Sequence, residues 1–378
     1  MLNYIFLLIL LPILLYYFYF LFSIYKGLEN LTKGGDDKIP DEFVSVIIPF
    51  RNESDNILQS LKNIEEQNYP KNKFEVIYVN DSSTDDSFEK IKSHIKSGNI
   101  RVISVPKNIA SKAHKKRAIK FGLENAKGEI IVTTDADCTH KSNWLSTLLN
   151  RLDNTTGLIS GPVEFIKEKG FFNQLQRLEF ASLIITGAGL IGINKPMICN
   201  GANLAYRKSV FNQVSGFDGQ MQLSSGDDEI LMQRIWSKTD YKIKFCLNRD
   251  AISYTKANKN INQFYNQRKR WASKGLFYEL KSTINNIIFI FLFYLSLLVL
   301  IILSFVNSTV YLPLFIIIFL LKILCEFLVM KRGTYLLFDN KMLKYFLPAE
   351  ILHIPYILLS VIAGIFGNFE WKGRQLSR

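Results

Sequence analysis

The chain has 378 residues, of which 48% are hydrophobic, and a formal net charge of +13. This length is enough for a sizeable core together with membrane segments. Lys and Arg are spread along the chain and flank apolar runs without a nucleic-acid-binding motif, which argues against nucleic acid and favours anionic lipid or a negatively charged substrate as the partner. The four cysteines show neither CxxC nor metal-ligand spacing, so we expect reduced thiols in a cytosolic setting.

The first 25 residues are predicted to form a transmembrane anchor. Residues 4–25 carry no charge and are long enough to span a bilayer. They lack the basic start and the small-residue cleavage site of a signal peptide. Residues 26–42 contain a Gly-Gly and an Asp-Asp pair and are expected to form a polar linker.

Residues 43–282 alternate between strand and helix patterns. Apolar runs at 44–49, 74–79, 100–105 and 130–133 have the composition of buried strands. Helical spacing appears from about Ser54, in the segment ending near Ile95, and in a basic segment at 112–126. This alternation predicts an α/β domain with a mainly parallel sheet. No Gly-x-Gly-x-x-Gly follows the first strand, which argues against a dinucleotide-binding domain.

Asp135 and Asp137 follow the last of these strands directly. Residues two apart in an extended chain point to the same side, and open α/β sheets bind ligands at the carboxyl ends of their strands. Two carboxylates placed in this way suit a hard divalent cation shared with substrate phosphates. An isolated Asp-x-Asp is more often a solvated turn. Here, however, two other strands end in loops that carry Glu53 and Asp81, so three strands bring carboxylates to one edge.

These features resemble the nucleotide-sugar half of the family 2 glycosyltransferases, which have the GT-A fold. The resemblance covers residues 44–271 and rests on motifs that follow the family's order. They are Val46-Ile47-Ile48-Pro49 with Asn52-Glu53, Val79-Asn80-Asp81-Ser82-Ser83-Thr84-Asp85, Thr134-Asp135-Ala136-Asp137, Asn200-Gly201-Ala202-Asn203-Leu204-Ala205-Tyr206-Arg207, Ser225-Gly226-Asp227-Asp228-Glu229 and Gln267-Arg268-Lys269-Arg270-Trp271.

The resemblance implies a site for a UDP-sugar donor. Asp81 would bond the uracil base, with Pro49 and Glu53 near the nucleoside. Asp137 would ligate a Mg²⁺ or Mn²⁺ ion that bridges the diphosphate, while Asp135 would contact the ribose or the metal. Lys112, together with Lys115, is a candidate for holding phosphate. This lysine segment departs from the family's glycine-containing form, so a solvated helix face is an equal alternative for both lysines.

The resemblance also implies the catalytic and acceptor residues. Asp228 is the candidate general base that takes the proton of the acceptor hydroxyl during inversion. Asp227 is the alternative, because the family often has Glu-Asp here, and Asp228 also fits the N-cap of a helix over 229–236. The acceptor side would be formed by Gly201, Ala202, Asn203 and Trp271. Arg270, with Gln267, would meet the diphosphate, which a planar guanidinium suits.

Residues 283–378 are predicted to form a membrane region with about three apolar segments, at 284–306, 310–330 and 347–367. Lys322 and Glu326 interrupt the second segment at i,i+4 spacing, where they can pair or have a functional role. The positive-inside rule places the catalytic domain in the cytoplasm and the N-terminus outside. With a third span, the basic tail would also lie outside, which breaks the rule. Either 347–367 is re-entrant or interfacial, or the tail is an exception.

The sequence therefore predicts an inverting glycosyltransferase of a bacterial inner membrane that moves a sugar from a UDP-sugar to a lipid acceptor at the cytoplasmic face. Within the family it resembles the ceramide and hopanoid glucosyltransferases, through the Q-x-x-R-W motif and Trp371-Lys372-Gly373-Arg374. The alternatives are a processive polysaccharide synthase of the poly-N-acetylglucosamine or cellulose type and a non-catalytic sugar-nucleotide sensor. Because Trp271 shortly precedes the span at 284, the acceptor pocket is expected to open toward the bilayer.

Overall fold

The computed structural model describes residues 2–32, 41–106, 113–223, 226–366, 369–371 and 374–376. Its central sheet has seven strands in the order β3-β2-β1-β4-β8-β6-β9. The strands from β3 to β4 are parallel, β8 runs antiparallel to β4 and β6, and β9 is parallel to β6. The mainly parallel sheet is therefore confirmed. The strands are β1 (Val44–Phe50), β2 (Phe74–Asn80), β3 (Ile100–Ser104), β4 (Ile130–Thr133), β6 (Thr156–Ser160), β8 (Leu204–Arg207) and β9 (Lys242–Phe245).

The sheet is covered on both faces, so its central strands are buried throughout. Alternate side chains of β1 enter different cores, as Ile47 and Val46 do, because successive residues of a strand point to opposite faces. One core is closed by α2 (Ile57–Glu65), α3 (Ser87–His94) and α5 (Trp144–Leu149). The other is closed by α4 (His114–Glu124), α7 (Lys208–Gln213) and α8 (Glu229–Lys238). The expected helices are present with shifted ends, and residues 107–112, including Lys112, lie outside the described part.

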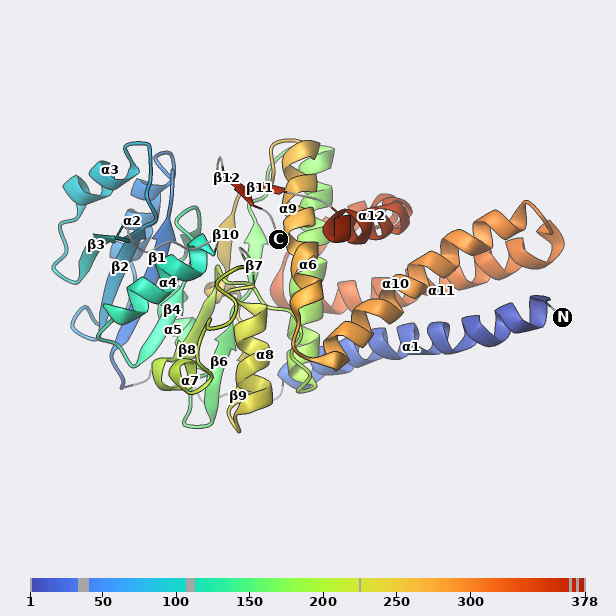
Figure 1. Ribbon diagram of the computed structural model, residues 1–378, viewed down its shortest axis with the longest axis horizontal. Helices are drawn as coiled ribbons and strands as arrows, with labels where there is room; N and C mark the ends of the chain where they lie inside the picture. Colours follow the sequence, from blue (N-terminus) through green and yellow to red (C-terminus); the bar gives the residue numbers. More distant parts are fainter. Residues whose placement is uncertain are drawn as a thin grey trace.

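A layer of helices separates the sheet from the membrane part (Figure 1). It consists of α6 (Phe171–Gly192) and α9 (Ile261–Ser273), which stand side by side across the long helices. A small sheet of β5 (Thr139–His140), β10 (Ser253–Thr255) and β7 (Val163–Phe165) lies between α6 and the main sheet. The shorter connections include η1 (Arg249–Ala251), η2 (Lys274–Phe277) and η3 (Asn340–Tyr345), and β11 (Phe369–Trp371) pairs with β12 (Arg374–Leu376).

Among the described residues, four helices are long and apolar enough to cross a membrane. They are α1 (Leu2–Leu31), α10 (Lys281–Ser304), α11 (Ser308–Leu337) and α12 (Phe346–Phe366) with the turn before it. The first three extend together away from the sheet, whereas α12 is drawn nearly end-on and crosses them (Figure 1). Because α1 continues through Leu31, residues 26–31 of the expected linker are helical. Residues 33–40 of that linker lie outside the described residues.

Lys322 and Glu326 form the pair that their spacing predicts, within a larger buried cluster. Lys322 Nζ lies 3.0 Å from Glu326 Oε1 and also contacts Glu350 of α12. Tyr17 of α1 donates to Glu326, and Tyr294 of α10 lies 3.4 Å from it. The cluster thus joins all four apolar helices. The buried charge of Lys322 is balanced by the carboxylates of Glu326 and Glu350.

Candidate functional site

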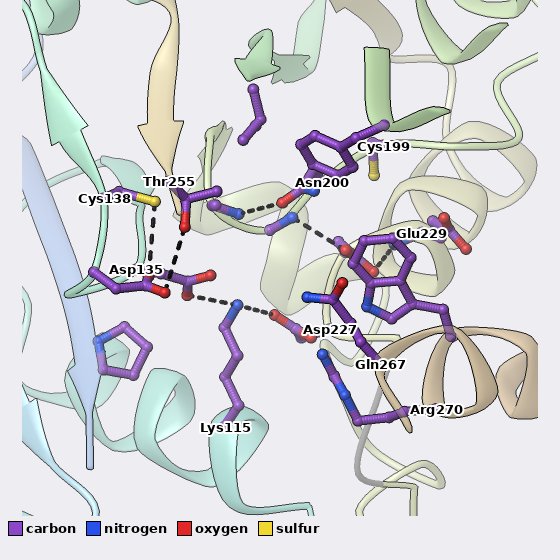
Figure 2. A pocket seen from close by; sticks show the side chains of 18 of the residues that line it. Lys115, Asp135, Cys138, Cys199, Asn200, Asp227, Glu229, Thr255, Gln267 and Arg270 are labelled. Carbon is purple, nitrogen blue, oxygen red and sulfur yellow. Dashed lines mark hydrogen bonds and ion pairs between the residues drawn. The ribbon is translucent and has the colours of Figure 1, made fainter. Parts of the chain in front are cut away.

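A cavity of about 430 Å³ opens at the carboxyl ends of β1, β2 and β4 (Figure 2). The parallel arrangement explains this placement, since the loops after all three strands meet at one edge of the sheet. The cavity brings together most residues that the sequence analysis selected. They are Pro49, Glu53, Asp81, Asp135 and Asp137 from the strand ends, Gly201, Ala202, Asp227 and Asp228 from the middle of the chain, and Gln267, Arg270 and Trp271 from α9.

Among the predicted site residues that the structure describes, Asn203 is the exception, because its side chain is used in the core. Its side chain is fully buried and donates to the backbone oxygens of Pro162 and Ala251, each at 2.7 Å. Its amide oxygen accepts a hydrogen bond from Trp144 Nε1 at 3.0 Å. Because the core uses both ends of this amide, Asn203 braces the floor of the site instead of contacting an acceptor.

Lys115 is the cation at the centre of the cavity, and sequence reasoning left its role open. Its Nζ lies 2.7 Å from Asp135 Oδ1 and 3.2 Å from Asp227 Oδ2, as Figure 2 shows. Burial would lower the pKa of Lys115, but Asp135 and Asp227 outweigh it and raise the pKa. Lys115 is therefore a charged group positioned between two carboxylates, and a solvated helix face is the wrong interpretation for it.

Asp135 and Asp137 both reach the cavity, which fits the predicted cation site. The Asp135 side chain is 34% exposed and already binds one cationic group, the ammonium of Lys115. Thr255 Oγ1 lies 3.4 Å from Asp137 Oδ2. These oxygen donors match the preference of Mg²⁺ and Mn²⁺ for carboxylate ligands.

Asp228 is held rigidly at the start of α8. Its Oδ1 accepts the backbone N–H of Glu229 at 2.7 Å, and its Oδ2 accepts that of Gly201 at 3.0 Å. The predicted N-cap is therefore present together with the placement in the cavity. Burial would raise the pKa of Asp228, but Lys274, these N–H groups and Lys115 outweigh it and lower the pKa. Asp228 is thus ionised at neutral pH.

Gly201 brings the backbone close to the paired carboxylates. A Cβ added at this position would lie 2.8 Å from Asp227 Oδ2 and 3.2 Å from Lys115 Nζ. Only a residue without a side chain lets the Gly201 N–H reach Asp228 without displacing this ion pair. The close approach of the backbone to this ion pair therefore explains why the motif has a glycine at position 201.

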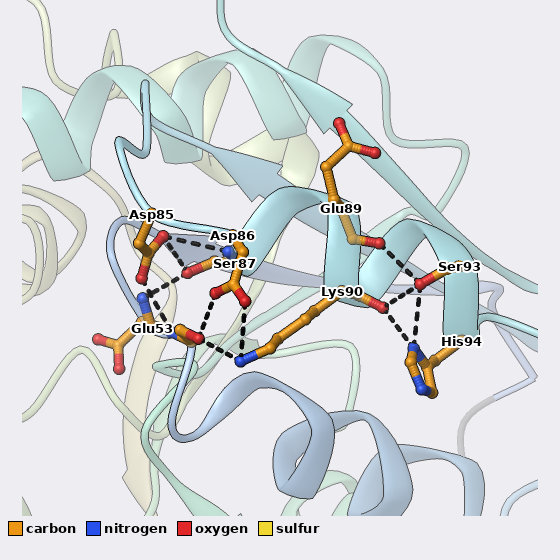
Figure 3. A network of polar contacts seen from close by, with 9 residues as sticks. Glu53, Asp85, Asp86, Ser87, Glu89, Lys90, Ser93 and His94 are labelled. Atoms are coloured by element: carbon orange, nitrogen blue, oxygen red, sulfur yellow. Dashed lines mark hydrogen bonds and ion pairs between the residues drawn. The ribbon is translucent and has the colours of Figure 1, made fainter.

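The loops after β1 and β2 are tied to each other and to α3 (Figure 3). The backbone N–H of Glu53 donates to Ser87 Oγ at 2.8 Å, and that of Ser54 donates to Asp85 Oδ2 at 3.1 Å. Asp81 is buried and paired with Arg117 of α4. These contacts orient the predicted nucleoside-binding carboxylates before any ligand arrives.

The motif on α9 divides its side chains between the cavity and the protein interior. Gln267, Arg270 and Trp271 line the cavity. The guanidinium of Arg270 forms no hydrogen bond or ion pair with any residue that the structure describes. Burial lowers the pKa of Arg270, an effect that Asp227 and Asp135 oppose in part. Arg270 is therefore a cation available to an anionic ligand.

Acidic and apolar side chains from different elements line the cavity, and we call these two sets its acidic end and its apolar end. The acidic end consists of Glu53, Asp81, Asp135, Asp137, Asp227, Asp228 and Glu229. The apolar end is lined by side chains of β7, α6, the segment after α6, and α10, which are Phe165, Phe180, Leu183, Ile184, Met197, Ile198 and Ile287. The sequence analysis missed the apolar end, since none of its residues belongs to a motif.

Lys274 and Tyr278 were also missed. Lys274 Nζ lies 2.9 Å from Glu229 Oε2 and 3.8 Å from Asp228 Oδ1, and Tyr278 donates to Glu229. Lys274 follows Trp271 by three residues, which is about one helical turn. Continuing the helical spacing of the α9 motif by one turn could therefore have identified Lys274 as a residue on the same face as Trp271. Tyr278 has no such signal.

The chain is similar in sequence to known glycosyltransferases. The model of the "Glycosyl transferase family 2" family matches residues 45–215. Glycosyltransferase AglE of Haloferax volcanii is 29% identical over 187 residues, which cover 49% of this chain and 59% of that protein. The undecaprenyl-phosphate 4-deoxy-4-formamido-L-arabinose transferase of Edwardsiella ictaluri is 29% identical over 175 residues, which cover 46% of this chain and 51% of that protein. The chain thus spans little more than half the length of these relatives.

A solved structure shares the fold over nearly the whole chain. It is the mannosyltransferase PcManGT from Pyrobaculum calidifontis in complex with GDP-Man and Mn²⁺, with a TM-score of 0.57. The alignment covers 95% of this chain and 98% of that one at 18% sequence identity. At this identity the match supports the fold alone.

Proposed function

Because residues 45–215 form a glycosyl transferase family 2 domain, we propose that this chain is a membrane-bound inverting glycosyltransferase that moves a sugar from a UDP-sugar to a lipid acceptor. The observation that carries the proposal is the two-ended cavity. The acidic end suits a nucleotide sugar with its metal, and the apolar end, which reaches α6 and α10, suits the lipid portion of an acceptor. The relative from Edwardsiella ictaluri, named for undecaprenyl phosphate, is consistent with this acceptor class.

The donor is proposed to bind at the acidic end. Its diphosphate would lie between a divalent cation and the cationic side chains of Arg270 and Lys115. Asp137, with Asp135, would hold Mg²⁺ or Mn²⁺, and that ion neutralises charge on the diphosphate leaving group. Arg270, whose guanidinium has no hydrogen-bonding partner among the described residues, and Lys115 line the cavity and would meet the phosphate oxygens. Asp81 and Glu53 would contact the nucleoside from the loops that α3 and α4 brace.

Asp228 is proposed as the general base. As the acceptor oxygen attacks the anomeric carbon, its proton passes to the Asp228 carboxylate. The bond from that carbon to the diphosphate breaks on the opposite face and releases UDP, which inverts the configuration. The two backbone N–H groups fix the carboxylate in place, and its lowered pKa keeps it ionised. Asp227 is the alternative base.

The test is a screen of UDP-sugars with purified protein in vesicles of bacterial lipid extract, with mass analysis of the lipids. We expect one sugar added per lipid, and no transfer after chelation of divalent cations. Asp228→Asn is the control and should bind the donor while turnover falls by about 10²-fold or more.

The other outcomes identify the alternatives. A ladder of products would indicate a processive polysaccharide synthase. Donor binding with neither transfer nor metal-dependent hydrolysis of the UDP-sugar would indicate a sensor. Loss of turnover in Asp227→Asn but not in Asp228→Asn would move the base to Asp227.

A further inference from the structure

Arg268 stands in the middle of the α9 motif but does not line the cavity. Its side chain is only 4% exposed. Its Nε donates to Glu179 Oε1 at 3.0 Å, and its Nη2 donates to Glu179 Oε2. Two such bonds between a guanidinium and one carboxylate determine the orientation of the guanidinium as well as its position.

Glu179 joins three helices through one carboxylate. It lies on α6 and accepts both bonds from Arg268 of α9. Its Oε1 also accepts a hydrogen bond from the hydroxyl of Tyr356 of α12 at 2.7 Å. This one carboxylate therefore links α9 to both α6 and α12.

Arg268 in turn holds the two neighbouring motif residues that do line the cavity. Its guanidinium carbon lies 4.4 Å from the Trp271 ring centroid and 4.5 Å from that of Phe264. Its Nη1 donates to Gln267 Oε1, which also accepts a bond from Asn258 Nδ2 at 2.9 Å. The amide oxygen of Gln267 is thus used inside the protein, and the face of Trp271 is set by the guanidinium.

We propose that Glu179 is a positioning residue for the acceptor. Through Arg268 it sets the orientation of Trp271 and Gln267, and through Tyr356 it connects them to α12. The inference rests on the proposed transfer to a lipid. In the part of the chain that the structure describes, Glu179 forms no hydrogen bond or ion pair with the aspartates of the acidic end. Loss of Glu179 should therefore weaken acceptor binding more than donor binding.

The connection continues into the membrane helices. The rings of Tyr356 and His353 lie 6.2 Å apart, and His353 Nδ1 lies 3.7 Å from Glu326 Oε2 in the buried cluster of α11. One path of contacts thus runs from the buried ion cluster to the motif helix α9. Through it, the packing of the apolar helices supports the acceptor side of the cavity.

The experiment compares Glu179→Gln with the wild type in lipid vesicles. Gln keeps the size of the side chain and an acceptor for Tyr356 but removes the charge that orients Arg268. We expect the KM for the lipid acceptor to rise about tenfold or more, since small displacements of a binding group reduce activity strongly. The slow hydrolysis of UDP-sugar by water should fall by a much smaller factor, because the aspartates of the acidic end keep their contacts.

The chain offers a matched control in Glu164→Gln. Glu164 of β7 forms a buried pair with Arg177, which lies two residues before Glu179 on α6 and so points to another side of the helix. This variant also removes a buried ion pair of α6, but not one that contacts α9. Its acceptor KM should equal that of the wild type.

Several outcomes would overturn the inference. One is a wild-type acceptor KM in Glu179→Gln, and another is an equal rise in Glu164→Gln. A third is hydrolysis that falls in step with transfer, which would mean that Glu179 supports the donor site or the fold. If Glu179→Gln does not fold, Arg268→Lys repeats the test, because Lys keeps the charge but cannot form both hydrogen bonds to Glu179. A wild-type KM for the lipid acceptor in Arg268→Lys would count against the proposal. Wild-type protein that transfers no sugar to lipid refutes the proposed function instead.

Discussion

Asp228 depends on Lys274 for its charge state. Burial opposes ionisation of the Asp228 carboxyl, and Lys274 is the strongest of the groups that reverse this effect and lower the pKa. Glu229 beside it shows what happens when the balance falls the other way, since burial outweighs Lys274 there and raises the pKa of Glu229. One lysine just beyond α9 therefore keeps the proposed base ionised.

We predict that Lys274→Met moves the acid limb of the pH–rate profile to higher pH. Loss of the cation raises the pKa of Asp228, so the carboxylate becomes protonated at a pH where it is still ionised in the wild type. The wild-type kcat/KM should stay flat down to about pH 5, because its base titrates below the ordinary carboxyl value of about 4. The variant should lose activity at a higher pH than the wild type, because burial, no longer opposed by Lys274, raises the pKa of Asp228.

Lys238→Met is the control for this profile. Lys238 ends α8 and pairs with Glu279 at 3.3 Å, away from the residues that line the cavity. Its profile should match the wild type. Identical profiles for all three proteins would show that Lys274 does not govern the base.

The crossing of α1 and α6 shows how one helix of the domain meets the membrane part. A Cβ on Gly27 of α1 would fall onto the backbone oxygen of Gly189 of α6, and one on Gly189 would lie 2.6 Å from the oxygen of Ile24. Glycines at both positions let the two backbones touch, as small residues do at close helix crossings in membranes. α6, on which the apolar end of the cavity depends, is thus fixed to the N-terminal helix.

We predict that Gly189→Ala destabilises the protein, although helix propensity alone favours Ala over Gly by about 1 kcal/mol. The added methyl group must push α1 from α6, and overpacking of this kind costs typically about 1–3 kcal/mol. Unfolding followed in detergent micelles should show a lower midpoint temperature than the wild type.

Gly275→Ala is the matched control, because its Cβ would meet only Ile287 Cδ1 at 3.9 Å. Its midpoint should be equal to or above the wild-type value. An increase in Gly189→Ala as large as that in the control would mean that the helices do not make this close contact.

The direction of α12 decides how the whole chain can sit in a membrane. α1, α10 and α11 run together, while α12 crosses them beside α9 (Figure 1). A Cβ on Gly364 of α12 would lie 2.5 Å from Ala272 Cβ of α9, so the end of α12 packs closely against α9. We propose that three helices span the bilayer and that α12 lies at its surface. With this arrangement, the positive-inside rule favours the same side of the membrane for the basic tail and for the catalytic domain.

Labelling with a membrane-impermeant thiol reagent tests this topology. Single cysteines are introduced as Glu124→Cys, Asn307→Cys and Arg378→Cys in a chain whose native cysteines are replaced by Ser. We expect Glu124→Cys and Arg378→Cys to react from the same face of sealed vesicles, and Asn307→Cys, between α10 and α11, from the other. Reaction of Arg378→Cys together with Asn307→Cys would mean that α12 spans the membrane.

The sequence by itself determined the sheet and the edge that carries the site. Runs such as Val44–Phe50 and Ile130–Thr133 are buried on both faces, so their composition is sufficient to identify them as strands of a parallel sheet. The position of Asp135 and Asp137 at the end of such a strand is also a local property. Most of the predicted site residues line the cavity for this reason, since each motif lies near the end of its own element.

Only the tertiary structure decided what each side chain does at that edge. Asn203 belongs to a motif yet is buried in the core, and Lys115 of a basic helix lies between two aspartates. The apolar end of the cavity, the Glu179–Arg268 pair and the direction of α12 depend on contacts between segments far apart in the sequence. Periodicity shows which face of a helix is apolar, but the partner of that face follows from how all the helices pack together.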